Sequence, residues 1–564
     1  MRVALTIAFT TLFTACLSPA ELAKKDTAET QTPPSDYFEQ GWTSQLREAF
    51  YYTPQGSHMI RADWLAVLER PDGQGRFAQA AYLARFGFLP PDGPSELNPE
   101  GYPIGFTIER DTNQAGLTCS ACHTANVRVG DDTLRIDGAP SHLDFDSFYQ
   151  DLALAVSLTA NDQERFARFA AALGVAKETA VAELYQQLTA YNVKLTGDAL
   201  LRKPVLASGY GRVDALTQII NSIAVRDQMR PANAYPVAAP TSYPPLWLAP
   251  QLEFVQWSPI AVSPIARNGG QVLGVFGKTN LSPVASEEDA FKSSIRLREL
   301  HQMELWLREL QPPRWDETRM GAIDPARAAL GETLFATHCA GCHNMGPDYA
   351  RTDAADNFFQ QTFIKISAVP IKKMGTDPTY SKSLLNRFVE STHLAALGIP
   401  NTENSPGVAR AARFFTAAVG ASIKRAIQDA GLTQQEIFEY NGLRFDKGED
   451  GKPVLTQAPA DTIARMRLKA GPLAAVWATG PYLHNGSVPT VYELLSPPSE
   501  RRSTFWTGGQ TIDLERLGYD SSEKTGKFLF NTRLAGNFNT GHAFPPAGLN
   551  HDERMAVIEY LKTQ

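Results

Sequence analysis

The sequence contains few cysteines, and none of them is spare for a structural disulfide. There are five in 564 residues: Cys16 near the start, then the pairs Cys119 with Cys122 and Cys339 with Cys342. Exported proteins with unassigned cysteines normally form disulfides. Both downstream pairs belong to one repeated pattern, so we do not expect a disulfide framework.

Excess positive charge and long apolar runs are also lacking. Lys and Arg number 53 against 60 Asp and Glu, a net charge of −7, which excludes the basic footprint of a nucleic-acid-binding protein. After the N-terminal leader, no stretch is apolar enough for a membrane span. The length allows two to three domains with their own cores. The 38 prolines and 41 glycines predict many loops between short elements.

The first sixteen residues, "MRVALTIAFTTLFTAC", have the pattern of an export signal. Arg2 is followed by an apolar run that is too short to span a bilayer, and then by small residues. Cys16 stands where bacterial lipoproteins are cleaved and lipidated, although an ordinary signal peptide remains the alternative. Residues 17–36 are polar and contain proline, which is typical of a flexible tether. We expect a protein on the periplasmic or extracellular side, attached to the outer membrane only if Cys16 is lipidated.

The repeated pattern is Cys-x-x-Cys-His, in "LTCSACHTAN" (117–126) and again in "HCAGCHN" (338–344). A zinc site would use two Cys pairs about 15–20 residues apart, whereas these pairs are 220 residues apart. A redox-active dithiol needs no adjoining histidine. Haem c attachment explains every residue, because the two thiols bind the haem vinyl groups and the histidine ligates the iron. We therefore predict two covalently bound haem c groups, with His123 and His343 as proximal ligands.

The rest of the chain predicts a mainly α fold, with two cytochrome c-like haem domains and long loop-rich insertions. Apolar residues recur at helical spacing; the expected helices cover residues 141–159, 162–174, 176–193, 213–225 and 286–310. Asp324 and Pro325 predict the N-cap and first residue of a helix that leads into the second motif, and 551–564 predicts a closing helix. The expected domains are a signal peptide (1–16), a tether (17–36), an N-terminal haem domain (37–312) and a C-terminal haem domain (313–564).

The residue on the second side of each iron decides whether it can react. For the second haem, His542 in "AGNFNTGHAFPP" is the favoured ligand, and a surface histidine is the alternative. His484 is predicted to hydrogen-bond a haem propionate, with ligation as its alternative. Met374 is a weaker ligand candidate.

For the first haem, His142 is the nearby histidine, and two roles stay open for it. It either ligates the iron or stands partly exposed at a helix start, after Ser141 as N-cap. We expect the first iron to be open or weakly ligated, with a distal pocket drawn from the apolar segment 243–277.

These motifs resemble the bacterial di-haem cytochrome c peroxidase superfamily. The resemblance covers most of the chain after residue 100, and its carriers are the two Cys-x-x-Cys-His motifs, "MGTDP" (374–378), "WATGPYLHNGSVPTVYELL" (477–495) and "GNFNTGH" (536–542). The broad family has Asp where this chain has Asn485. The "PYLHNGS" form, "VQW" (255–257) and "RNGG" (267–270) are most similar to the rubber oxygenase-like branch.

The resemblance implies a haem-dependent oxidoreductase that reacts with hydrogen peroxide or dioxygen at the haem on His123. The haem held by His343 and His542 would then relay electrons, and Trp257 is either an inter-haem relay or a core residue. Possible partners are a hydrophobic alkene or a small redox protein. A calcium ion is frequent in relatives, but no compact carboxylate loop here requires one. The alternative is a non-catalytic di-haem electron-transfer protein.

Overall fold

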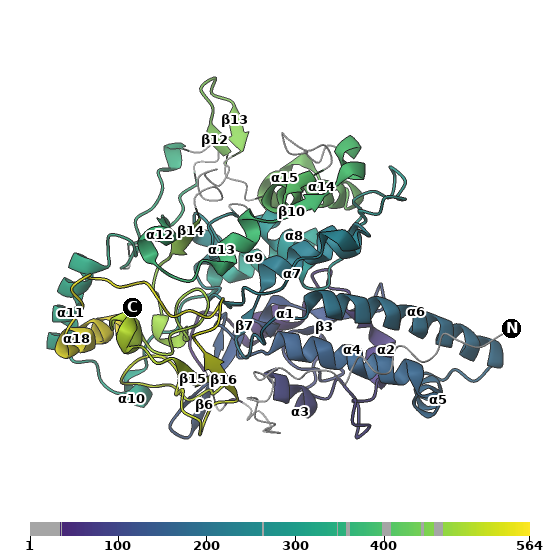
Figure 1. Cartoon of the computed structure of the whole chain (residues 1–564), viewed down its shortest axis with the longest axis horizontal. Coiled ribbons are helices and arrows are strands. Elements are labelled where there is room, and N and C mark those ends of the chain that lie inside the picture. Colours follow the sequence, from purple (N-terminus) through teal and green to yellow (C-terminus); the bar gives the residue numbers. More distant parts are fainter. Residues whose placement is uncertain are drawn as a thin grey trace.

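The computed structural model describes residue 34 and residues 36–261, 264–346, 348–356, 361–397, 408–441, 445–455 and 466–564. The predicted signal peptide, Cys16 and nearly all of the tether lie outside these residues. Helices α4, α5 and α6 form one end of the molecule, and α11 and α18 lie together at the other (Figure 1).

Helices are distributed along the whole described chain, and several are single turns. Their bounds are α1 (Ser44–Tyr52), α2 (Ala62–Val67), α3 (Ala80–Leu83), α4 (Phe145–Asn161), α5 (Gln163–Ala172), α6 (Glu178–Arg202), α7 (Ala215–Asn221), α8 (Pro264–Gly274), α9 (Leu297–Glu309), α10 (Glu317–Met320), α11 (Pro325–His338), α12 (Ile371–Met374), α13 (Thr379–Leu385), α14 (Ala411–Asp429), α15 (Gln434–Asn441), α17 (Val491–Leu494) and α18 (His551–Lys562).

The strands form small separate sheets of two or three members. Their bounds are β1 (Asp36–Tyr37), β2 (Ile60–Arg61), β3 (Phe106–Glu109), β4 (Gln114–Leu117), β5 (Thr124–Val129), β6 (Asp132–Asp137), β7 (Arg212–Val213), β8 (Thr241–Ser242), β9 (Ser367–Pro370), β10 (Phe388–Glu390), β11 (Val408–Arg410), β12 (Phe445–Lys447), β13 (Pro453–Leu455), β14 (Arg467–Ala470), β15 (Thr504–Thr507) and β16 (Phe528–Asn531). The three-stranded sheets have the orders β1-β6-β5 and β2-β4-β3.

Most predicted helices are present, and their caps show why they begin where they do. Asp324 accepts hydrogen bonds from the backbone N–H groups of Ala326 and Arg327, which confirms it as the N-cap of α11. The prediction for Ser141 is wrong, because Asp144 caps α4 instead. The predicted helix at 286–310 begins only at Leu297, since the preceding residues form turns.

The predicted mainly α fold with two cytochrome c-like haem domains is wrong. The structure is mixed, with 41% helix and 14% strand. No helix leads into the first motif: it follows β4 and runs directly into the antiparallel hairpin β5–β6. This hairpin was missed in "TANVRVGDDTLRID", where apolar residues alternate around a two-residue turn at Gly130 and Asp131, a period of two rather than 3.6.

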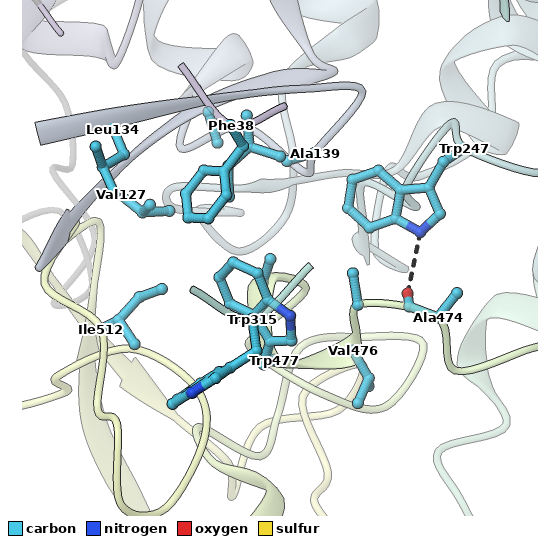
Figure 2. Packing of buried hydrophobic residues seen from close by; sticks show 14 of the residues in the cluster. Phe38, Val127, Leu134, Ala139, Trp247, Trp315, Ala474, Val476, Trp477 and Ile512 are labelled. Carbon is cyan, nitrogen blue, oxygen red and sulfur yellow. Dashed lines mark hydrogen bonds between the residues drawn. The ribbon is translucent and has the colours of Figure 1, made fainter. Parts of the chain in front are cut away.

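The largest apolar core joins the first part of the chain to its last part. Phe38 and Trp315 both pack against the fully buried Trp477, with ring centroids 5.4 Å and 5.8 Å away (Figure 2). The Trp247 indole donates a 3.0 Å hydrogen bond to the carbonyl of Ala474. Arg128 of β5 exchanges backbone hydrogen bonds with the segment around residues 510–512. The hairpin after the first motif is therefore fixed to the C-terminal part of the chain.

No helix among the described residues combines the length and the apolar character needed to cross a bilayer.

Helices α11 and α18 approach each other closely at Gly331. A Cβ atom at this position would lie 1.9 Å from the carbonyl oxygen of Ala556 in α18. The small residue thus allows the helix before the second motif to pack against the last helix of the chain.

We predict that Gly331→Ala lowers the free energy of unfolding by about 1–3 kcal/mol, the usual cost of overpacking. Gly197→Ala is the matched control, because Gly197 is an exposed residue of α6 and its added Cβ would meet no neighbouring atom within 4 Å. The control should stabilise by up to about 1 kcal/mol through helix propensity. Urea denaturation measures both, and equal signs would contradict the close approach of the two helices.

Candidate functional site

The first motif is held between strands and contacts the central segment of the chain. The turn Cys119–Ala121 follows β4, and β5 begins directly after His123. The Nδ1 atom of His123 lies 2.8 Å from the carbonyl oxygen of Pro244. Since a carbonyl only accepts, Nδ1 must donate its proton, and Nε2 keeps the lone pair that a metal ligand requires.

The second motif repeats this arrangement on a different scaffold. Helix α11 ends at His338, and the Nδ1 atom of His343 donates a 2.9 Å hydrogen bond to the carbonyl of Gly471. Its Nε2 is likewise left as the ligand atom.

Sequence reasoning missed these two carbonyls, although a signal is present. Each acceptor residue stands directly before a Pro-Leu pair, in "PPL" (244–246) and in "GPL" (471–473). The residue before a proline avoids helical geometry, so its carbonyl is available to a side chain. A short repeat therefore accompanies the repeated haem motif.

The surroundings of the motif cysteines favour neither a zinc site nor a redox site. All four are free thiols, and burial raises the pKa of Cys119 and Cys122 to about 12. Redox-active cysteines have lowered pKa values instead. Within the described ranges, which contain all four, no three Cys, His, Asp or Glu side chains converge as a metal site would. This excludes a zinc centre built from both pairs.

A largely apolar cavity of about 240 Å³ lies beside the second motif. Cys339 and His343 line one part of it, and Met374, His484 and His542 line others. Its apolar wall includes Trp247, Leu248, Trp257, Leu468, Leu473 and Val476. Seven residues between 243 and 257, in the segment that we assigned to the distal pocket of the first haem, therefore line the cavity beside the second motif.

The pair of His343 and His542 has the spacing of two ligands on one metal. Their ring centroids are 6.2 Å apart. An imidazole nitrogen lies about 1.1 Å from its ring centre and about 2.0–2.1 Å from a bound metal, so two opposed rings should have centres about 6.2–6.4 Å apart. Burial lowers the pKa of His542 to about 3 and also lowers that of His343, so both rings are neutral at pH 7. The donor set fits a haem iron at this position.

The loop that carries His542 passes so close to the segment at Met374 that only glycine fits beside it. A Cβ atom on Gly541 would lie 2.3 Å from the carbonyl carbon of Gly375 and 2.4 Å from the carbonyl oxygen of Met374. The backbone N–H of His542 donates to that same Met374 oxygen at 2.8 Å. His542 itself has a φ of 50°, an uncommon conformation for a residue with a side chain.

Two buried side chains hold the preceding part of this loop. The Asp377 carboxylate accepts the backbone N–H groups of Gly536 and Phe538 at 2.9 Å and 3.1 Å. The Asn485 amide donates to the carbonyls of the same two residues, both at 3.1 Å. A carboxylate at 485 could not make these bonds, which explains why Asn stands there in this chain.

Arg501 holds the end of the loop and was not predicted as a site residue. Its guanidinium group is buried and donates to the backbone carbonyls of Asn539, Gly541 and His542. The same group also donates to the carbonyls of Leu494 and Ser496. Arginine is suited to this task because its planar group offers five donors in a fixed geometry.

A continuous strip of backbone and hydrogen bonds connects the two motif histidines. The strip begins at Pro244, whose carbonyl accepts the hydrogen bond from His123. Two residues earlier in the chain, the carbonyl of Ser242 accepts the Trp257 indole N–H at 3.0 Å. The carbonyl of Trp257 in turn accepts the backbone N–H of Lys469 at 2.8 Å.

Lys469 lies two residues before Gly471, the acceptor of His343. Trp257 is therefore the middle residue of this strip. It also packs against an apolar core cluster, so both predicted roles remain compatible with its position.

His484 and His142 lie in different surroundings. His484 is buried and lines the large cavity, and its Nδ1 atom has no hydrogen-bond partner in the described part of the chain. Its propionate-binding role stays a prediction. His142 is also buried, which contradicts a partly exposed residue at a helix start. Its ring packs edge-on against Tyr519, 4.6 Å away, and it does not line the large cavity.

Comparison with known proteins identifies a haem-related segment and a full-length relative. Residues 468–507 match a family described as RoxA-like, cytochrome c-like. The uncharacterised protein y4iJ of Sinorhizobium fredii is 31% identical over 587 aligned positions, which cover 93% of each chain. A second uncharacterised protein of that strain, y4iM, is 27% identical over 43% of this chain and 44% of its own length.

The matched segment contains Gly471 and His484, which line the large cavity. It also contains Asn485 and Arg501, which hold the loop of His542. It indicates haem c as the cofactor and a haem-dependent oxidoreductase as the class. It also supports the rubber oxygenase-like branch of the resemblance.

We predict that Asn485→Asp loosens the His542 loop, because two carbonyls lose their donor and face a buried carboxylate. We expect the free energy of unfolding to fall by about 1–3 kcal/mol. Urea denaturation of the haem-loaded protein measures this change.

Asn192→Asp is the matched control. Asn192 uses its side-chain oxygen, which accepts from the Thr196 hydroxyl and is kept on substitution. Equal effects of the two substitutions would show that the Asn485 amide does not hold the loop.

Proposed function

This chain belongs to the family of the Sinorhizobium fredii protein y4iJ, and we propose that it is an exported di-haem c-type cytochrome oxidoreductase that reacts with hydrogen peroxide or dioxygen. Cys119, Cys122 and His123 would hold the reactive haem. Cys339, Cys342, His343 and His542 would hold the relay haem.

The observation that carries this proposal is the different surroundings of the two motif histidines. The imidazole of His542 lies beside that of His343, with ring centroids 6.2 Å apart, so both would hold the same haem iron. The ring next to His123 is Tyr243, with centroids 6.2 Å apart, and no second histidine ring packs against His123 in the described ranges. A second histidine beside one motif and none beside the other supports an enzyme rather than a simple electron carrier.

The residues around the sites support a division of labour. Haem iron, when bound, supplies the electron-transfer and oxidant-activating chemistry that amino-acid side chains lack. Pro244 and Gly471 fix the tautomer of each proximal histidine and raise its basicity as a ligand. Trp257, whose indole donates to the carbonyl of Ser242, would serve as the relay between the two sites. His484 would donate to a carboxylate of the second cofactor from the cavity wall.

The reaction partners follow from this division. Hydrogen peroxide or dioxygen would react on the side of His123, and the electron donor or second substrate would be a small redox protein or a hydrophobic alkene. The proposal includes no nucleic acid, and it includes calcium only as a structural ion near the haems.

Low-temperature EPR of the oxidised protein, after a haemochrome assay for two haems c, tests the proposal. We expect one high-spin and one low-spin ferric signal. His542→Ala should convert the low-spin signal to high-spin, because the second imidazole is lost, whereas His551→Ala, a change at an exposed histidine, should leave both signals intact.

Turnover assays then separate the reactions. Peroxide consumption with a reduced cytochrome marks a peroxidase, and oxygen consumption with an alkene polymer and no external reductant marks an oxygenase. Two low-spin signals without either activity would overturn the enzyme proposal in favour of a di-haem electron carrier.

The leader supports a separate proposal about location, namely that Cys16 is lipidated and anchors the protein to the outer membrane from the periplasmic side. We predict that Cys16→Ser moves the protein from the membrane fraction to the soluble periplasmic fraction, because the acyl anchor is lost. Immunoblots of both fractions measure the change. If the wild-type protein is already fully soluble and Cys16→Ser changes nothing, the leader is an ordinary signal peptide.

A further inference from the structure

A second, much smaller cavity lies between the loop that follows β6 and the C-terminal part of the chain. Its volume is about 20 Å³, and residues 140–142, Ser242, Thr507 and Tyr519 are part of its lining. The peptide N–H of Ser141 donates to the carbonyl of Cys122, so this wall of the cavity is tied to the first haem motif.

Four polar atoms on residues of this lining are buried and have no hydrogen-bond partner among the described residues. They are Nε2 of His142, the hydroxyl oxygens of Ser242 and Thr507, and the phenol oxygen of Tyr519. Each of these four residues is more than nine-tenths buried. A single unpaired buried polar group is costly, and four around one cavity require a common partner.

The size and the chemistry of the cavity select that partner. A single water molecule needs about 10–15 Å³ and makes two to four hydrogen bonds to buried polar groups. Each hydroxyl group can both donate and accept a hydrogen bond, and a neutral imidazole nitrogen does one or the other according to its tautomer. These four groups can therefore satisfy the two donors and two acceptors of a water molecule. We propose that this cavity binds one water molecule, held by His142, Ser242, Thr507 and Tyr519.

Ions fit the cavity less well. Among the described residues of the lining Asp520 is the one carboxylate and no thiol is present, so a metal cation would have a single anionic ligand. Burial, together with the positive charge of Lys527, lowers the pKa of His142 to about 4, so the imidazole is neutral at pH 7. Asp520 also lines the cavity and accepts from the Ser522 backbone N–H; its negative charge disfavours an anion.

The water site gives His142 a role that does not depend on the proposed haem chemistry. The site joins three segments that are distant in sequence: the loop between β6 and α4, the end of β8, and the segment from β15 to Tyr519. Ser242 borders both cavities, and its carbonyl is the acceptor of the Trp257 indole. The bound water therefore supports the strip between the two motif histidines from its polar side.

Tyr519→Phe and Thr507→Val test the site by the sign of their effect on the thermal midpoint of the haem-loaded, full-length protein. With water bound, each substitution removes one of its partners, and both midpoints should fall. In a dry cavity each would remove an unpaired buried hydroxyl, and the midpoints should rise or stay unchanged. Thr507→Ser keeps the hydroxyl, so it should retain the water and separates loss of hydrogen bonding from loss of packing.

A crystal structure of the wild-type protein gives an independent readout. One ordered water within hydrogen-bond distance of the four atoms is the expected result. An empty cavity would overturn the proposal. So would an anomalous peak at this position after a bromide soak, because it would identify an anion site.

Discussion

The arrangement of both candidate sites depends on one type of hydrogen bond, from Nδ1 of a motif histidine to a backbone carbonyl. A histidine can ligate a metal through Nε2 only while Nδ1 carries the proton, and a carbonyl partner enforces that tautomer. Pro244 and Gly471 provide these carbonyls. Each precedes a proline, so its carbonyl is not used in a helix. The ring orientation is thereby set by distant segments rather than by the motif itself.

The opposed pair of His343 and His542 requires a second constraint, since the loop of His542 has little regular structure of its own. Asp377 and Asn485 hold the start of the loop by complementary bonds, one accepting from and the other donating to the same two residues. Arg501 holds its end, and Gly541 allows the close approach to Met374. The motifs "MGTDP", "PYLHNGS" and "GNFNTGH", well separated in sequence, are therefore parts of one support for a single imidazole.

The two ends of the described chain are not independent in this fold. Phe38 and Trp477 share a core, and β5 is hydrogen-bonded to the segment near residue 511. These contacts alone therefore link the part of the chain that carries the first motif to the C-terminal part. The strip through Ser242 and Trp257 is a short route between them, and the small polar cavity lies against the same serine.

Local signals in the sequence were sufficient wherever the chemistry or the capping of a residue is itself local. The spacing of the cysteine pairs, the Asp324 cap of α11 and most of the helices could be predicted because neighbouring residues determine them. The fold class could not, because the hairpin after the first motif has a period of two and a helix-based interpretation passes over it. The partners of His123 and His343, the burial of His142 and the support of the His542 loop were decided only by tertiary structure. Pro244 and Gly471 lie more than a hundred positions from their histidines, and Asn485 and Arg501 lie 51 and 38 positions from loop residues that they hold. Spacing along the chain carries no information about such contacts.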